Sequence, residues 1–185
     1  MNLKVELLKG NSRAQVDRVV NYIGDNPKRF EQLIKIYLEG PYRITQRASW
    51  PMSYCVEAHP MLITPHLKTL LDYLKKPGIH DAVKRNTIRL LQFAPIPKRY
   101  YGRIADICFG YLENRKEAVA IKAFSMTVLA RIIKDEPDLR KSLQLLIEDQ
   151  MPYATAAFKV RARNVLKQMS PESIHKPAII ATGIN

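Results

Sequence analysis

The chain contains 185 residues, of which 46% are hydrophobic and 25% charged, and this composition excludes an intrinsically disordered chain. Two cysteines are too few for a disulfide framework, and no segment approaches the ~20 consecutive apolar residues of a membrane helix. The 30 basic and 17 acidic residues give a net charge of +13. This charge favours an acidic partner, which could be nucleic acid, an acidic protein surface or an anionic membrane. The N-terminal residues do not resemble a signal peptide, so we expect a cytoplasmic protein.

Helix-start signals recur along the chain, after an expected N-terminal capping helix pair in residues 1–25. Each signal has a proline at or near the first helical turn, where proline is favoured. The four signals are Asn26–Pro27, Thr64–Pro65, Pro97 and Pro137. Apolar residues with helical periodicity follow each of them. We therefore predict a first set of helices at 27–38, 64–75, 98–113 and 137–149.

A second helix follows each of these, and the second helices repeat one another. The segments AVKRNTIRLL, AIKAFSMTVL and AFKVRARNVL begin at Ala82, Ala120 and Ala157, which are 38 and 37 residues apart. A step of 38 residues back from Ala82 reaches ITQRASWPMS, which begins at Ile44. The aligned columns agree in residue type, and one column is small throughout: Ser49, Thr87, Ser125 and Ala162. We predict second helices at 42–59, 79–93, 116–134 and 152–168.

Paired helices, a period near 38 residues and a lack of strand signals predict an all-α solenoid. The pattern Val-Lys-x-x-Thr-x-x-Leu-Leu at residues 83–91 resembles the second helix of HEAT repeats. The resemblance covers residues 26–169 as four repeats and implies an α-α right-handed superhelix of HEAT/armadillo-like helix pairs. We expect the C-terminal tail, residues 170–185, either to pack over the last repeat or to dock on a neighbouring molecule.

The charge of the chain is distributed unevenly between the two sets of helices. The predicted second helices carry 13 basic and 3 acidic residues, whereas the first helices carry 10 and 7. The resemblance to HEAT arrays implies that second helices line the concave face. A concave surface of one sign concentrates its field on a partner. We therefore expect a basic concave face that holds an acidic protein segment or nucleic acid.

The basic residues of the second helices have two interpretations. In HEAT repeats one basic column bonds to the neighbouring repeat, and the resemblance implies such a structural ladder for Lys84, Lys122 and Lys159. The remaining side chains form either a solvated basic face or a contact surface. The predicted partner-binding residues are Arg47, Trp50, Tyr54, Arg85, Arg89, Arg161, Arg163 and Lys167.

Trp50 is the only tryptophan of the chain, and it lies four residues before Tyr54 on the same helix face. It occupies the repeat column of Ile88, Met126 and Arg163, next to the core columns. Trp50 therefore either packs between repeats or presents an aromatic platform among arginines. Such a platform is suited to stack a nucleic-acid base or to anchor a peptide.

The segment YCVEAH contains three reactive residue types, Cys55, Glu57 and His59. Zinc requires three or four ligands at spacings such as Cys-x-x-Cys or His-x-x-x-His, and neither spacing occurs. Glu57 points to a different side of the helix from His59 and cannot orient it as a base. The sequence also lacks a phosphate-binding glycine loop, a dinucleotide fingerprint and a Gly-x-Ser-x-Gly motif. We predict no catalytic residue, no metal site and no cofactor.

The charge pattern also resembles that of the bacterial HEAT-repeat alkylpurine DNA glycosylases, which are short basic solenoids that cradle DNA. Those enzymes use a concave-face aspartate flanked by tryptophans, whereas the second helices here carry Asp81 alone and a single tryptophan. The signature loop of the all-helical lyases is also missing. We therefore predict a non-enzymatic scaffold that is a monomer or a weak homodimer and does not bind membranes. DNA or RNA binding is the alternative.

Overall fold

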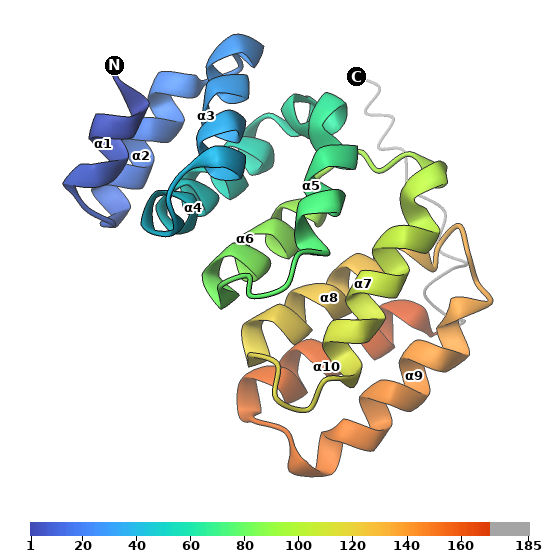
Figure 1. Ribbon diagram of the computed structural model, residues 1–185. Helices are drawn as coiled ribbons and strands as arrows, with labels where there is room; N and C mark the ends of the chain where they lie inside the picture. Colours follow the sequence, from blue (N-terminus) through green and yellow to red (C-terminus); the bar gives the residue numbers. More distant parts are fainter. Residues whose placement is uncertain (171–185) are drawn as a thin grey trace, which may run out of the picture.

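The computed structural model describes residues 1–170, and these residues form ten α-helices and three short 3-10 helices without a strand (Figure 1). The helices occur as five consecutive pairs. The first helices of the pairs are α1 (Leu3–Lys9), α3 (Pro27–Glu39), α5 (Leu67–Leu74), α7 (Tyr101–Glu113) and α9 (Leu139–Gln150). The second helices are α2 (Arg13–Ile23), α4 (Tyr42–Ala58), α6 (Asp81–Leu91), α8 (Val119–Ile132) and α10 (Ala156–Met169). The predicted all-α fold is confirmed, and the arrangement is consistent with an α-α superhelix.

The second helices stack on one another and form a continuous layer. Helix α4 packs between α2 and α6, and α8 packs between α6 and α10. The first helices lie against this layer, with α3 on α4 and α7 on α8. We call the even-numbered helices the inner layer and the odd-numbered helices the outer layer. Helices therefore contact mainly their own pair or an adjacent pair, as expected for a solenoid.

The repeat columns predicted from the sequence form the core of this stack. The small column (Ser49, Thr87, Ser125 and Ala162) is fully buried, with 0% of each residue exposed. Small side chains at these positions let neighbouring inner-layer helices approach closely. Two hydroxyl groups of this column also make contacts between adjacent repeats: Thr87 Oγ1 lies 2.9 Å from the Tyr37 hydroxyl, and Ser49 Oγ accepts a hydrogen bond from Asn86 Nδ2 at 2.9 Å.

The structure confirms the predicted helix start at Asn26–Pro27 and contradicts the one at Thr64–Pro65. The Asn26 side chain caps α3 by accepting a hydrogen bond from the Arg29 N–H at 3.1 Å, and Pro27 is in the first turn, as predicted. The predicted cap at Thr64 is wrong, because Thr64 lies in the 3-10 helix η1 (Pro60–His66) and α5 begins only at Leu67. The Thr64 hydroxyl is buried without a hydrogen-bond partner among the described residues. Pro65 disfavours the α-helical conformation at the residue before it, which delays the α-helix.

The other two 3-10 helices, η2 (Lys98–Tyr100) and η3 (Met151–Tyr153), precede α7 and α10.

The predicted C-terminal tail, residues 170–185, lies outside the described residues except for Ser170. Within residues 1–170, no helix is both long enough and apolar enough to cross a membrane.

Candidate partner-binding surface

The difference in charge between the two layers is larger with the observed helix boundaries than with the predicted ones. Helices α4, α6, α8 and α10 carry eleven basic and two acidic residues. Helices α3, α5, α7 and α9 carry seven of each and are electrically neutral. The net charge of the helix pairs therefore resides in the inner layer.

Most of this positive charge is used inside the fold. Six of the eleven basic side chains donate hydrogen bonds to groups 28 to 40 residues away in the sequence, which is about one repeat. The six are Arg47, Lys84, Arg89, Lys122, Arg131 and Arg161. In these four helices, more than half of the basic residues therefore bridge adjacent helix pairs.

Arg47 binds the end of α1. Its Nη1 donates to the carbonyl oxygens of Leu7 at 3.0 Å and Leu8 at 2.9 Å. The last carbonyls of a helix have no intrahelical partner and carry partial negative charge, so a guanidinium stabilises them. This contact gives the predicted partner-binding residue Arg47 a role within the fold.

Arg131 makes the equivalent contact at the end of α6, and sequence reasoning did not single it out. Its Nη1 donates to Leu91 O at 2.6 Å, and its Nη2 donates to Ala94 O at 3.0 Å. Burial lowers the pKa of the Arg131 guanidinium from its ordinary value. The only sequence signal was a basic residue in the last turn of a helix, which gives no information about a carbonyl in the preceding repeat.

Arg89 of α6 and Tyr54 of α4 form a packed cluster with two further residues of α4 and one of α2. Arg89 Nη1 donates to Ser53 Oγ at 3.2 Å, and its Nη2 forms an ion pair with Glu57. The Arg89 guanidinium lies 4.3 Å from the centroid of the Tyr54 ring, and the guanidinium of Arg13 lies at the same distance from it. Two cation–π contacts therefore cover the Tyr54 ring, and Glu57 serves as an ion-pair partner.

The three predicted ladder lysines differ in their contacts. Lys84 Nζ lies 3.1 Å from a carboxylate oxygen of Glu117, whose side chain is only 3% exposed. Lys122 Nζ donates to Gln150 Oε1 at 2.9 Å. Both contacts join consecutive repeats, as the ladder interpretation expects. Lys159 belongs to the last helix pair of the described chain, is partly buried and has no following pair there to contact.

The basic residues of α10 lie away from the Trp50 region. Arg161 donates to the hydroxyl of Thr127 in α8 at 3.1 Å. Arg163 and Lys167 are exposed. These three lie on α10, three helix pairs along the chain from Trp50 on α4, and none of them lines a cavity with Trp50.

Besides Tyr54 and Arg89, the structure brings a second pair of the predicted residues together, Trp50 and Arg85. They line a cavity of about 350 Å³ between the beginnings of α6 and α8. Trp50 is partly buried, whereas Arg85 is exposed and has no hydrogen bond or ion pair within residues 1–170. Asn11 and Gln46 complete the wall on the side of α2 and α4. This cavity, which we call the Trp50 pocket, presents an aromatic surface next to an unpaired cation.

The remaining polar groups of the Trp50 pocket also suit a negatively charged ligand. His80 Nδ1 accepts a hydrogen bond from the Ala82 N–H at 3.0 Å, so a neutral His80 ring carries its proton on Nε2 and can donate it. Helix α8 begins at Val119, and its N-cap residue Ala118 has no side chain that could accept a hydrogen bond from the first-turn N–H groups. Asp81 is the one carboxylate in the wall, and Lys84 lies 3.6 Å from it.

The thiols of Cys55 and Cys108 are both buried. Burial raises the pKa of the Cys55 thiol to about 12, and it also raises the pKa of Cys108 to about 12. Both thiols are therefore protonated at neutral pH and are poor nucleophiles and ligands. Among the described residues, no group of three or more His, Cys, Asp or Glu side chains is placed to hold a metal ion.

Comparison with known proteins identifies the family of the chain. Residues 3–169 match the HEAT repeat domain family, and this range includes all ten helices of the described structure. No curated protein and no solved structure matches the chain, and the resemblance to DNA alkylation-repair enzymes finds no support. HEAT repeat modules generally serve as protein-binding scaffolds. The family match and the stacked helix pairs agree, and the chain belongs to the HEAT repeat domain family.

Proposed function

We propose that this HEAT repeat protein is a non-enzymatic binding module that holds an acidic segment of a partner protein at the Trp50 pocket. The observation that carries the proposal is one cavity that contains a partly buried tryptophan and an exposed arginine without an ion-pair partner among residues 1–170. Tryptophan and arginine dominate the energetics of many protein interfaces because they combine large contact area with directional hydrogen bonds. A carboxylate supplied by the partner would accept those bonds from Arg85.

The distribution of unpaired charge favours a protein partner over nucleic acid. A protein that follows a nucleic-acid backbone neutralises several phosphates in a row. Six of the eleven basic side chains of α4, α6, α8 and α10 already donate to groups about one repeat away, and the exposed Arg85 and Arg163 lie on helices α6 and α10, two pairs apart. A local acidic contact at one pocket requires fewer unpaired cations than a phosphate track does.

Fluorescence of Trp50 tests the proposal directly, because the chain has no other tryptophan. We expect an acetylated oligoglutamate peptide to change the emission of Trp50 in a saturable titration. Arg85→Met should weaken binding by about three- to tenfold, the range of a partly exposed ion pair. Arg43→Met is the matched control, because Arg43 is also exposed on the inner layer but does not line the pocket.

Two outcomes count against the proposal. If the emission spectrum does not respond to the peptide, Trp50 is not part of the binding site. If Arg43→Met and Arg85→Met weaken binding equally, the interaction depends on net charge and not on the pocket. An oligothymidylate of matched charge distinguishes the alternative. If it binds more tightly than the peptide, and its affinity falls with a log–log salt slope of about −4, as expected for six phosphates on a single strand, then the partner is nucleic acid.

A further inference from the structure

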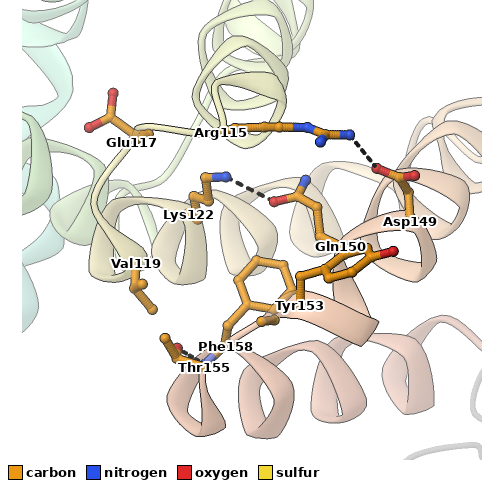
Figure 2. A pocket seen from close by; sticks show the side chains of 10 residues that line it. Arg115, Glu117, Val119, Lys122, Asp149, Gln150, Tyr153, Thr155 and Phe158 are labelled. Atoms are coloured by element: carbon orange, nitrogen blue, oxygen red, sulfur yellow. Dashed lines mark hydrogen bonds and ion pairs between the residues drawn. The ribbon is translucent and has the colours of Figure 1, made fainter.

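A second pocket lies on the opposite side of the α8 N-terminus from the Trp50 pocket, and it contains a buried cation. The cavity measures about 240 Å³ and lies between the start of α8, the end of α9 and the start of α10. Figure 2 shows Lys122 beside Gln150, with Arg115 and Asp149 on one side and the rings of Phe158 and Tyr153 on the other. Neither Trp50 nor Arg85 belongs to it.

The pocket has a polar floor, apolar walls and an exposed rim. Lys122 is only 6% exposed and lies at the floor, whereas Tyr153 at the rim is 92% exposed. Arg115 and Asp149 also lie at the rim, where they form a long ion pair of 3.9 Å with both side chains well exposed. Phe158 is almost fully buried and forms part of the apolar wall. A ligand must therefore pass apolar surface before it reaches the cation.

The hydrogen bonds of the Lys122 ammonium group are incompletely satisfied. An ammonium has three donors, and the described structure gives Lys122 a single acceptor, Gln150 Oε1 at 2.9 Å. The orientation of the Gln150 amide is fixed, because its Nε2 donates to Leu112 O at 2.9 Å and to Leu146 O at 3.3 Å. Lys122 therefore has one neutral hydrogen-bond partner in the described structure, and two of its N–H donors are available to a ligand in the cavity.

Lys122 also lacks a carboxylate of its own. The buried acid Glu117 also lines the pocket, but the two oxygens of its carboxylate already accept from Lys84 at 3.1 Å and from the Ala118 N–H at 3.2 Å. Burial lowers the pKa of Lys122, and the charge of Glu117 only partly opposes this effect. A buried cation without an ion-pair partner is costly, so an anion brought by a ligand gains more here than at the surface.

We propose that this pocket binds a glutamate side chain of a partner polypeptide, with the carboxylate on Lys122 and the methylene groups against Phe158 and Tyr153. A glutamate has an apolar stem that matches the walls and a charged tip that matches the floor. The volume suits one side chain, because pockets for drug-sized ligands span about 300–1,000 Å³. A phosphate has no apolar stem and would leave the walls uncovered. The inference does not depend on the function proposed above.

Two small probes test the pocket without a known partner. The first is N-acetyl-glutamate N-methylamide, and the second is the corresponding glutamine derivative, which has the same shape without the charge. In spectra of ¹⁵N-labelled protein, we expect the glutamate probe to shift the amide resonances of Val119, Gln150 and Phe158. The glutamine probe should bind at least about tenfold more weakly, because a hydrogen bond between charged groups is replaced by a neutral one.

Matched variants locate the effect. Lys122→Met keeps the apolar stem and removes the charge, and it should weaken binding of the glutamate probe by about tenfold or more. Lys134→Met removes the same charge from an exposed position beyond the end of α8 and should leave binding unchanged. Thermal melting followed by circular dichroism verifies that both variants are folded. If Lys122→Met does not fold, the wild-type Lys122 ammonium can be titrated with and without probe, and a bound carboxylate must raise its pKa.

Three results overturn the proposal: equal binding of the two probes, resonance shifts confined to other parts of the protein, or undiminished binding by a folded Lys122→Met variant. Inorganic phosphate serves as a third probe. If phosphate shifts the same resonances as strongly as the glutamate probe, the pocket is a general anion site and the assignment to glutamate is wrong. None of these outcomes bears on the Trp50 pocket, because that site is read by tryptophan emission.

Discussion

Arg131 offers the sharpest test of the conclusion that inner-layer charge mainly joins adjacent repeats. We consider the substitution Arg131→Met, which retains a long apolar side chain and removes the guanidinium. The two bonds lost go to carbonyl oxygens of Leu91 at 2.6 Å and Ala94 at 3.0 Å, just where α6 ends. No other described side chain donates to these two carbonyls.

The expected loss follows from these two bonds. A hydrogen bond from a charged donor contributes about 1.5–3 kcal/mol, so two fully buried bonds would contribute about 3–6 kcal/mol. Arg131 is only partly buried, and water can replace part of the interaction, so we expect the free energy of unfolding to fall by about 2–3 kcal/mol. For a chain of this size that loss corresponds to a decrease of roughly 4–12 °C in the melting temperature.

Urea denaturation followed by far-ultraviolet circular dichroism measures the loss. Arg131→Lys should recover only part of it, because a single ammonium does not reproduce the planar two-donor geometry. Arg163→Met is the control, since Arg163 is exposed on the same layer and surface substitutions change stability by about 0.5 kcal/mol or less. If Arg131→Met is as stable as Arg163→Met, the two carbonyl contacts do not stabilise the stack and the reasoning is refuted.

Three further predictions concern other contacts. Lys84→Met should destabilise the protein by about 3 kcal/mol, because it leaves the buried carboxylate of Glu117 without its cation. Adding Glu117→Gln should restore most of the lost stability. A double variant no more stable than Lys84→Met contradicts this prediction. Hydrogen bonds from Lys68 and Arg103 hold the pKa of Asp72 below its ordinary value of 3.8, so its contribution to stability exists above that pH and disappears as the pH falls through the lower folded-state value. The stability difference between wild type and Asp72→Asn should therefore shrink in acid, and a constant difference down to full protonation would show that no such shift exists. Finally, the two buried cysteine thiols should resist a disulfide reagent at pH 8 in the folded protein and react after unfolding; rapid reaction in the folded state contradicts their burial.

Local sequence patterns were sufficient to predict the helix pairs. A helix requires only apolar periodicity and start signals within about a dozen residues, and both recur in this chain with a period near 38. The repeat alignment also identified the small column, which is fully buried. The start of α5 was predicted too early at Thr64, because two prolines close together stabilise a 3-10 helix that periodicity does not reveal.

The roles of the basic residues could not be predicted in the same way. Arg47 and Arg85 occupy the same repeat column, yet Arg47 binds the last carbonyls of α1 and Arg85 faces an open pocket. The difference arises because α1 is a short helix that ends beside Arg47. No equivalent helix end lies beside Arg85 within the described residues. A column alignment compares positions within repeats and contains no information about such a neighbour.

The amino-acid sequence by itself determined that this protein is an all-α array of helix pairs with a positively charged inner layer, because propensity, periodicity and charge are properties of short segments. Only the tertiary structure decided which of those charges are available. Each basic side chain can reach a carbonyl, a carboxylate or solvent, and the choice depends on which group from one repeat away lies within about 3 Å of it. That distance is set by the stacking of the helix pairs. Within residues 1–170, this stacking leaves Arg85 beside Trp50 without an ion-pair partner, and it leaves Lys122 at the floor of its own pocket with one neutral partner.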